Sequence, residues 1–191
     1  MTDFKPDIAK ALEVLRSGGV ILYPTDTIWG LGCDATNQEA VKKIYNLKRR
    51  ADNKSMIILV DTPNRINSYI EEVPDIAFDL MELADKPLTL ILEGAKNLAE
   101  NAINQEDRSV GIRVVNEAFC RQLIRQFKKP IVSTSANFSG EPSPAIFDEI
   151  SETLISQVDY VVEYRQDDIK KAAPSGIIKV ETNGGIKIIR A

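Results

Sequence analysis

The chain has 191 residues, and its 24 Lys and Arg against 28 Asp and Glu leave a formal net charge of −4 at pH 7. This acidic balance argues against a protein whose main task is non-specific nucleic-acid binding, because such proteins carry a basic surface. The complete lack of histidine excludes Ser-His-Asp and Cys-His catalysts, and it excludes any metal site that uses histidine ligands.

Composition indicates the broad class of protein. With 43% hydrophobic and 27% charged residues, the chain can form an ordinary soluble core, and its length suits a single domain over residues 1–191. Cys33 and Cys120 lie far apart in the sequence, as expected for reduced thiols in a cytoplasmic protein. No apolar segment is long enough to span a membrane, and the N-terminus lacks a signal-peptide core, so no membrane association is expected.

The first third of the chain alternates predicted helices and strands. The first helix ends at Gly18-Gly19, and the strand Val20–Tyr23 follows at once. Thr36-Asn37-Gln38-Glu39 has the pattern of a capping box that opens a second helix, and Ser55–Val60 is the next predicted strand. Apolar residues at helical spacing define the buried faces of the two helices: Ile8, Leu12 and Leu15, then Val41, Ile44 and Tyr45.

The middle of the chain continues the alternation. The pattern predicts a helix over Pro74–Ala84, strands over Leu88–Leu92 and Val110–Val115, a helix capped by Asn116, and a strand over Ile131–Ser135. The inward faces of these two helices are predicted from Ile76, Leu80 and Leu83, and from Phe119, Leu123, Ile124 and Phe127.

Strands dominate the last quarter of the chain. A helix is predicted over Phe147–Ile155, followed by strands over Tyr160–Glu163, Ile177–Val180 and Ile186–Ile189. The last two strands are joined through Asn183-Gly184-Gly185, a hairpin signal. The whole pattern predicts one α/β domain with a twisted, mixed parallel and antiparallel sheet flanked by helices.

One glycine motif fails as a nucleotide site. Gly30-Leu31-Gly32-Cys33-Asp34-Ala35 matches the dinucleotide-binding pattern, with Asp52 about 20 residues further on. However, Pro24–Trp29 separates the glycines from the preceding strand, and Asp52 comes before the next strand instead of at its end. A Rossmann site is therefore disfavoured, and the chain has no Gly-Lys-Ser or Gly-Lys-Thr for a Walker A loop.

Two loops carry hydroxyl groups directly after an apolar run. They are Tyr23–Gly32 and Ser133–Gly140, and each ends in glycine. Such loops present hydrogen-bond donors at the edge of an open α/β sheet, where ligands bind. Lys48-Arg49-Arg50 ends the second predicted helix, and fixed cations beside such donors predict an anionic ligand such as a phosphate. The alternative for these cations is a solvated helix end, which the helix macrodipole favours.

The loops belong to an ordered set of motifs: Tyr23-Pro24-Thr25-Asp26-Thr27, Gly30-Leu31-Gly32, Lys48-x-Arg50 and Ser135-x-Asn137-x-Ser139-Gly140. In order and spacing the set resembles the YrdC/TsaC family of threonylcarbamoyl-AMP synthases, over residues 18–190. The resemblance implies a twisted α/β sheet around a deep basic concavity. The chain departs from many members at Leu59, where they have a histidine.

The resemblance also implies a reaction and a set of partners. L-threonine, bicarbonate or CO₂, and ATP would form threonylcarbamoyl-adenylate and pyrophosphate. A downstream threonylcarbamoyl-transferase complex would then modify position 37 of tRNAs. Mg²⁺ would enter with ATP, with no metal held by the protein's own side chains. Direct contact with tRNA or other RNA is expected to be weak.

This chemistry explains the residue types in the motifs. A carbamate made from the threonine amine attacks the α-phosphorus of ATP, so the site needs positioning and charge stabilisation without a covalent nucleophile. Lys48 and Arg50 are the predicted clamps for phosphoryl charge, and Ser135 and Asn137 complete the predicted catalytic set. The resemblance assigns further residues to the substrates: Thr27, Arg113 and Ser135 to L-threonine, and Arg50, Lys54, Ser109, Ser133, Ser143 and Arg190 to ATP.

Plainer interpretations stay open for several of these side chains. Arg113 lies in an apolar strand, where a buried arginine needs a partner and can belong to a structural ion pair. Arg190 can be part of a frayed terminus, and Trp29 fits packing better than stacking on a substrate.

A function of a different class is an RNA-binding or ribosome-maturation module with the same fold. It is motivated by a basic run consisting of Lys42, Lys43, Lys48, Arg49, Arg50 and Lys54. The net charge of −4 weighs against it, and salt-sensitive RNA binding without ATP chemistry would support it. The related carbamoyl-transfer domain of hydrogenase maturation is disfavoured, because such domains resemble parts of larger chains with cysteine-rich fingers.

Overall fold

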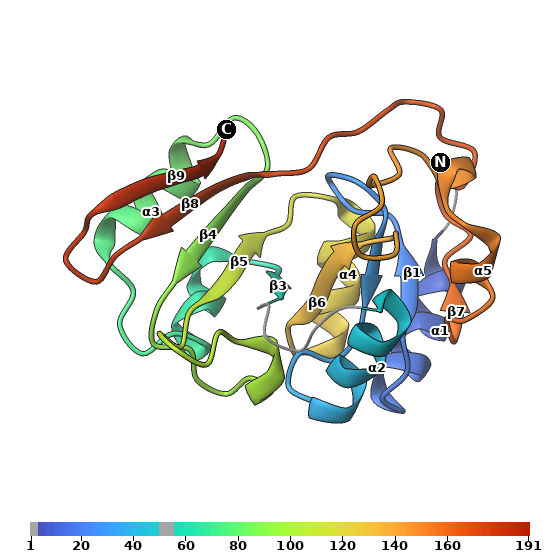
Figure 1. Cartoon of the computed structure of the whole chain (residues 1–191), viewed down its shortest axis with the longest axis horizontal. Helices are drawn as coiled ribbons and strands as arrows, with labels where there is room; N and C mark the ends of the chain where they lie inside the picture. Colours follow the sequence, from blue (N-terminus) through green and yellow to red (C-terminus); the bar gives the residue numbers. More distant parts are fainter. Residues whose placement is uncertain (1–3, 50–55) are drawn as a thin grey trace.

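Nine strands form one sheet over the residues that the computed structural model describes, 4–49 and 56–191 (Figure 1). Their order across the sheet is β7-β1-β2-β6-β3-β5-β4-β8-β9. The strands are β1 Ile21–Tyr23, β2 Gly30–Gly32, β3 Ile57–Val60, β4 Leu88–Leu92, β5 Val110–Val114, β6 Ile131–Ser135, β7 Tyr160–Val161, β8 Gly176–Val180 and β9 Ile186–Arg190. The helices are α1 Lys5–Arg16, α2 Gln38–Lys48, α3 Asp75–Leu83, α4 Ala118–Phe127 and α5 Glu152–Ile155, with 3-10 turns η1 Pro63–Ser68, η2 Glu100–Ala102 and η3 Phe147–Glu149.

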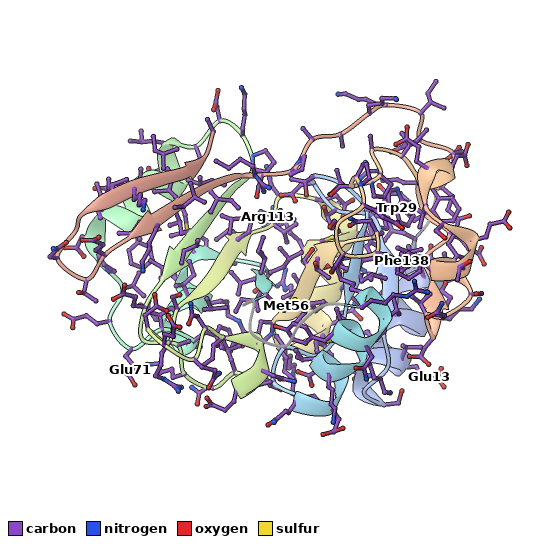
Figure 2. The ribbon with its side chains drawn as sticks, in the orientation of Figure 1. Glu13, Trp29, Met56, Glu71, Arg113 and Phe138 are labelled. Carbon is purple, nitrogen blue, oxygen red and sulfur yellow. The ribbon has the colours of Figure 1, made fainter. Side chains whose placement is uncertain are left out.

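The sheet mixes parallel and antiparallel pairs. β3 pairs with β5, β4 with β8 and β1 with β7 in parallel, and the other neighbouring pairs are antiparallel. Helices cover both faces of the twisted sheet (Figure 1), and the side chains between them fill the interior (Figure 2). The predicted α/β fold, a twisted mixed sheet flanked by helices, is confirmed.

Two apolar cores lie on opposite faces of the sheet. Because side chains alternate along a strand, Ile58 and Leu59 of β3 point to different faces. Leu59 joins the core that includes Phe119 of α4, whereas Ile58 joins the core that includes Ile44 of α2. Each large apolar side chain buried in this way contributes about 1.5–3 kcal/mol, so α4 and α2 hold the central strands from both sides.

Gly30-Leu31-Gly32 forms a central strand of the sheet. Leu31 lies opposite Leu22 of β1 and Thr134 of β6. At Gly32 a Cβ atom would come within 2.6 Å of Tyr23 Cε1, so a larger residue does not fit without movement. The sequence pattern placed these glycines at the end of a loop, because three residues containing two glycines have little strand propensity of their own.

Two predicted helix caps are displaced by one residue. The side chain of Asn37 accepts hydrogen bonds from two N–H groups in the first turn of α2, and the side chain of Glu117 accepts one in α4. Of the predicted caps, Thr36 donates its hydroxyl to Asp34 two residues earlier, and the backbone N–H of Asn116 donates to Asp26. The predicted capping residues are therefore wrong: each helix is capped by the next residue along the chain, and the Thr36 hydroxyl belongs to a local turn with Asp34.

Other element boundaries also differ. Residues 147–155 are predicted as one helix but form η3 and the short α5, because Ile150 adopts an extended backbone and turns into the core. Leu83 is 82% exposed instead of inward, and Ala77 is the buried residue of α3. In the described parts of the chain, no helix combines the length and apolar character needed to cross a membrane.

The strands that the sequence predicts start and end within three residues of their predicted limits, and β2 was not among them. β1 begins at Ile21 instead of Val20, β7 ends at Val161 instead of Glu163, and β9 continues to Arg190. Ser55, at the start of the predicted third strand, lies outside the described residues.

Candidate active site

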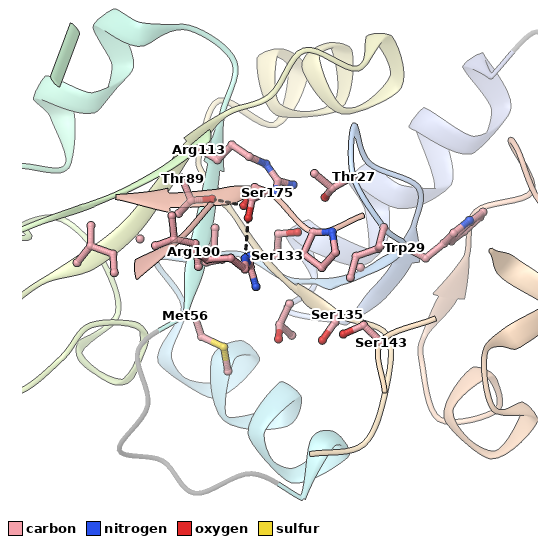
Figure 3. A pocket seen from close by; sticks show the side chains of 18 residues that line it. Thr27, Trp29, Met56, Thr89, Arg113, Ser133, Ser135, Ser143, Ser175 and Arg190 are labelled. Atoms are coloured by element: carbon pink, nitrogen blue, oxygen red, sulfur yellow. Dashed lines mark hydrogen bonds between the residues drawn. The ribbon is translucent and has the colours of Figure 1, made fainter. Parts of the chain in front are cut away.

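A cavity of about 300 Å³ opens on the face of the sheet that carries Ile57. Gly111 and Ser133 lie directly opposite Ile57 on the two neighbouring strands, so their side-chain positions share that face. α1 and α4 cover one end of this face and leave the cavity at the other. The lining residues come from the 24–29 loop, from β2 to β6, and from β8 and β9: Thr27, Ile28, Trp29, Gly30, Met56, Ile57, Thr89, Ile91, Gly111, Arg113, Ser133, Thr134, Ser135, Ser143, Pro174, Ser175, Ile177 and Arg190 (Figure 3).

Gly111 keeps the floor of the cavity open. A Cβ atom at this position would lie 3.1 Å from Ile57 Cγ1 and 3.3 Å from Thr89 Cγ2. Both distances are tighter than ordinary van der Waals contact, so a side chain here would press on the floor. The middle of three adjacent strands therefore presents backbone to the cavity.

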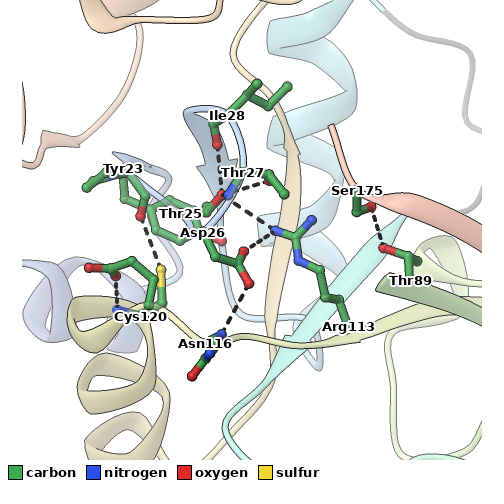
Figure 4. Close-up of polar contacts among 12 residues, drawn as sticks. Tyr23, Thr25, Asp26, Thr27, Ile28, Thr89, Arg113, Asn116, Cys120 and Ser175 are labelled. Carbon is green, nitrogen blue, oxygen red and sulfur yellow. Dashed lines mark hydrogen bonds and ion pairs between the residues drawn. The ribbon is translucent and has the colours of Figure 1, made fainter. Parts of the chain in front are cut away.

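Arg113 is one of two charged side chains among the described residues that line the cavity. It extends from β5, and its side chain is 5% exposed. Its Nη2 lies 3.2 Å from Asp26 Oδ1 and donates a long hydrogen bond of 3.5 Å to Thr25 Oγ1 (Figure 4). Arg113 therefore forms the structural ion pair that the plainer interpretation predicts. The same side chain also lines the cavity.

Arg190 is the second charged lining residue. Its Nε donates a 2.7 Å hydrogen bond to the carbonyl oxygen of Ser175, and Ser175 Oγ lies 2.8 Å from Thr89 Oγ1 (Figure 3). Burial lowers the pKa of Arg190, and the positive charge of Arg113 lowers it further. The charge of Arg113 is therefore close enough to act on Arg190. Arg190 is held in β9, so the frayed-terminus interpretation is wrong.

Lys48 lies behind the cavity wall. Only 3% exposed at the end of α2, it donates from Nζ to the carbonyl oxygens of Ser135 at 2.5 Å and Asn137 at 2.7 Å. The amide of Asn137 in turn donates to the carbonyl oxygens of Phe138 and Glu141. Lys48 and Asn137 thus shape the loop that follows β6, and Ser135 at its start lines the cavity.

The structure brings six of the predicted site residues into one cavity: Thr27, Arg113, Ser133, Ser135, Ser143 and Arg190. Ser109 does not line it. That residue is 4% exposed, just before β5, and its N–H donates to Asp107. Arg50 and Lys54 lie outside the described residues.

Sequence reasoning missed several lining residues. Thr89 is a hydroxyl in an otherwise apolar strand, a signal that was available, and Ser175 meets it only because β8 pairs with β4. Trp29 lines the cavity while it packs on Phe147 at a ring distance of 4.9 Å, which agrees with the packing interpretation. Arg49 is exposed with its guanidinium 4.7 Å from the Phe138 ring.

Neither cysteine is suited to nucleophilic chemistry. Burial raises the pKa of Cys33, and it raises that of Cys120 well above the ordinary value, with Glu117 and Asp26 adding to the effect. Cys120 Sγ donates to the carbonyl oxygen of Pro24 at 3.1 Å. Both stay protonated thiols, and a thiol is a poor nucleophile compared with its thiolate.

The family model described as "Telomere recombination", for Sua5, YciO and YrdC proteins, matches residues 13–191. The chain belongs to the Sua5/YciO/YrdC family. Threonylcarbamoyl-AMP synthase of Pseudoalteromonas translucida is 34% identical over 159 residues, covering 82% of this chain and 84% of the relative. Putative threonylcarbamoyl-AMP synthase of Methanocaldococcus jannaschii is 36% identical over 184 residues, covering 94% and 84%.

A solved member of the Sua5/YciO/YrdC family has been crystallised with an amino acid. P. abyssi Sua5 complexed with L-threonine superposes with a TM-score of 0.80 at 26% identity, over 91% of this chain. The present chain spans 50% of that longer protein. In this Sua5/YciO/YrdC chain, the cavity combines two arginines with hydroxyl groups from five separate segments, an arrangement able to hold carboxylate and phosphate groups by charge-assisted hydrogen bonds.

Proposed function

We propose that this chain is an L-threonylcarbamoyladenylate synthase, a nucleotidyltransferase that converts L-threonine, bicarbonate or CO₂, and ATP into threonylcarbamoyl-adenylate and pyrophosphate. One observation carries the proposal. A single cavity gathers Arg113, Arg190 and a row of hydroxyls, in a family whose relatives are named for this activity. Threonine, bicarbonate and ATP all carry anionic groups that require such donors.

We assign the threonine carboxylate to Arg113. Its guanidinium is buried at the cavity wall, and a planar guanidinium binds a carboxylate in bidentate fashion. Thr27 and Ser135 supply the hydroxyls nearby for the rest of the amino acid. The L-threonine complex of P. abyssi Sua5 supports the choice of amino acid.

We assign ATP to the rest of the cavity. Ser133, Ser143 and Arg190, which line this cavity, would contact its phosphates or ribose. Apolar side chains suited to the flat face of a base line the same cavity: Met56, Ile57, Ile91 and Ile177. Arg50 and Lys54 remain proposed ATP ligands from the resemblance, whereas the geometry gives no support for Ser109.

The reaction needs no covalent intermediate with the enzyme. A carbamate oxygen attacks the α-phosphorus, the bond to the bridging oxygen breaks, and pyrophosphate leaves with the electron pair. Fixed donors that meet the developing charge would lower the barrier. Lys48 would act through Ser135 and Asn137, whose carbonyl oxygens it holds. The product would then pass to a threonylcarbamoyl-transferase complex that modifies tRNA.

Magnesium would enter as part of the MgATP substrate. Among the described residues, no group of three or more Asp, Glu, His or Cys side chains is arranged to hold a metal ion. Mg²⁺ is commonly bound by substrate phosphates and water with few protein ligands, which fits a cavity lined by hydroxyls.

The RNA-binding alternative has less support. Of the basic run that motivates it, Lys48 is buried and bonded to two backbone carbonyls, and Lys43 donates to the carbonyl oxygen of Gly18. Lys42, Lys43 and Arg49 are the exposed members of the run that the structure describes. Three exposed cations, one of them bonded to a backbone carbonyl, form a small basic surface for binding a phosphate backbone.

The deciding experiment is substrate-dependent turnover. The protein is incubated with ATP, Mg²⁺, L-threonine and bicarbonate, and nucleotides and pyrophosphate are resolved while each component is omitted in turn. We expect pyrophosphate and a labile adenylate that both disappear without threonine or bicarbonate. Pyrophosphate release that ignores threonine, or salt-sensitive RNA binding with no turnover at all, would overturn the proposal.

A further inference from the structure

We infer that Asp26 is a positioning residue for substrate recognition: it holds Arg113 so that the guanidinium is ready to receive a carboxylate in the cavity. The inference rests on the proposed function for the identity of the carboxylate, L-threonine. Asp26 reaches Arg113 from the 24–29 loop, on the side where Thr25 also contacts the guanidinium (Figure 4).

The pair is buried on both sides. The Arg113 side chain is 5% exposed and the Asp26 side chain is 10% exposed, with Nη2 and Oδ1 3.2 Å apart. A buried guanidinium without a counter-charge is strongly destabilising. Asp26 therefore permits Arg113 to stay charged at the wall of the cavity before any anionic substrate arrives.

Asp26 is itself fixed in place. Its Oδ2 accepts a 3.1 Å hydrogen bond from the N–H of Asn116, between β5 and α4. The same loop is held from its other side by Arg165, whose Nη1 donates to the carbonyl oxygen of Thr25 at 3.0 Å. Thr25 Oγ1 in turn accepts from the N–H of Thr27 at 3.0 Å. Hydrogen bonds from two other segments thus fix the loop that carries Asp26. Thr27 of the same loop lines the cavity.

The pair leaves hydrogen-bonding capacity unused. Among the described residues, neither Arg113 Nε nor Asp26 Oδ1 has a hydrogen-bond partner, although both atoms are buried. The contact between Arg113 and Asp26 is thus an ion pair by distance without a well-aligned hydrogen bond. Buried polar atoms are nearly always paired. The pair is thus held by charge more than by fixed hydrogen bonds, and the Arg113 side chain still lines the cavity.

Loss of the Asp26 charge should therefore damage threonine binding more than ATP binding. In Asp26→Asn, the shape is kept but the buried guanidinium loses its counter-charge, so Arg113 is free to turn toward other acceptors. We expect the KM for L-threonine to rise by about tenfold or more, while the KM for ATP changes by about twofold or less. Asp26→Glu keeps the charge and should recover part of the threonine affinity.

Asp34→Asn is the matched control. Asp34 is also a buried acid, with its Oδ2 2.6 Å from Lys129 Nζ, but it does not line the cavity. The Asp34→Asn substitution should lower thermal stability without a change in the KM for threonine. This comparison separates positioning of Arg113 from general loss of a buried ion pair.

A double-mutant cycle with Arg113→Ala gives the sharper test. If Asp26 acts through Arg113, Asp26→Asn should have little further effect on threonine binding once Arg113 is absent. A purely structural role predicts additive losses. Threonine affinity is measured by calorimetry as well as by turnover, so that binding is tested even in variants with low kcat.

The outcomes separate the inference from the proposed function. Normal or tighter threonine binding in a folded Asp26→Asn variant would overturn the inference alone, because Asp26 would then only weaken the field of Arg113. Threonine binding without turnover in the unmodified protein would overturn the synthase function and leave the Asp26 test intact. No threonine binding by the unmodified protein would overturn both.

Discussion

Lys48 shows how the role of a motif residue depends on where its charged group ends. The sequence predicts a clamp on substrate phosphates, but the ammonium lies 2.5 Å from the carbonyl oxygen of Ser135 and 2.7 Å from that of Asn137. A lysine that is 3% exposed and bonded in this way shapes the loop after β6. Its effect on catalysis is then partly transmitted through Ser135, which lines the cavity.

Lys48→Ala is therefore expected to reduce both turnover and stability. Two partly buried carbonyl oxygens would lose a charged donor, which costs about 1–3 kcal/mol in the free energy of unfolding. Chemical denaturation and steady-state kinetics of the same preparation check this. Lys42→Ala, on the exposed side of α2, is the control. Turnover lost with unchanged stability would contradict the structural part of the role.

At Gly111 the prediction concerns only the room for a side chain on the cavity floor. In Gly111→Ala the new methyl group would meet Ile57 Cγ1 at 3.1 Å and Thr89 Cγ2 at 3.3 Å, on the floor of the cavity. We expect substrate affinity to fall by about tenfold, with stability lowered by about 1 kcal/mol from crowding. Calorimetry with ATP and L-threonine measures the first effect and thermal denaturation the second. Undiminished affinity for both ligands would show that they bind away from this floor.

At the scale of elements, helix α2 carries the cation motif to the cavity wall. It begins at Asn37, whose Oδ1 accepts hydrogen bonds of 3.0 and 3.1 Å from the first turn. It ends at Arg49, which adopts a left-handed conformation with φ of 53°. Because Lys48 is the last helical residue, any shift in the start or end of α2 would move its Nζ relative to Ser135.

Asn37→Ala should destabilise the protein more than Thr36→Ala. Removal of an N-cap side chain costs about 1 kcal/mol, whereas Thr36 is outside the helix and donates its hydroxyl to Asp34. Urea denaturation of the two variants measures the difference. Equal losses, or a larger loss in Thr36→Ala, would favour the capping box that the sequence pattern predicts.

At the scale of the whole molecule, the cavity is complete only when the C-terminal strands β8 and β9 pair beside β4, in the middle of the sequence. β8 pairs with β4 and places Ser175 against Thr89, and β9 brings Arg190 to the rim. An ion-pair cluster stabilises the attachment of β8 to the rest of the sheet. Lys179 Nζ of β8 lies 2.9 Å from Asp107 Oδ2 and 3.0 Å from Glu93 Oε1.

This cluster makes stability depend on pH. Burial alone would raise the pKa of Asp107, but hydrogen bonds from Ser109 and Lys179 outweigh it and hold the pKa below the ordinary value. Its contribution is present above the ordinary value of 3.8 and is lost as the pH falls through the lowered pKa. Because the groups are partly exposed, the contribution is about 1 kcal/mol or less.

Asp107→Asn should consequently flatten the acid limb of the stability curve. The unmodified protein should lose more stability than the variant between about pH 5 and about pH 2. Urea denaturation at a series of pH values, with Glu141→Gln as an exposed control, measures the difference. Parallel curves for the two proteins would contradict a role for Asp107.

Local patterns in the sequence predicted a large part of the fold. Apolar spacing located α1, α2 and α4 because their buried faces repeat at helical intervals. The caps lie one residue later than predicted, because the Thr36 hydroxyl bonds locally to Asp34 and the Glu117 carboxylate accepts from the first turn of α4. β2 was missed because its place in the sheet comes from its neighbours β1 and β6, and its glycines have little strand propensity.

The sequence by itself determined which residue types are available for the chemistry. Its lack of histidine excluded histidine-based catalysis and metal ligation. It also indicated two hydroxyl-rich loops, a cationic helix end and an arginine in an apolar strand. Only the tertiary structure decided that Arg113 meets Asp26, that Lys48 bonds to backbone, and that Arg190 closes the rim. The reason is physical: these contacts join strands that are distant in sequence, and local propensity carries no information about which distant strands will pair.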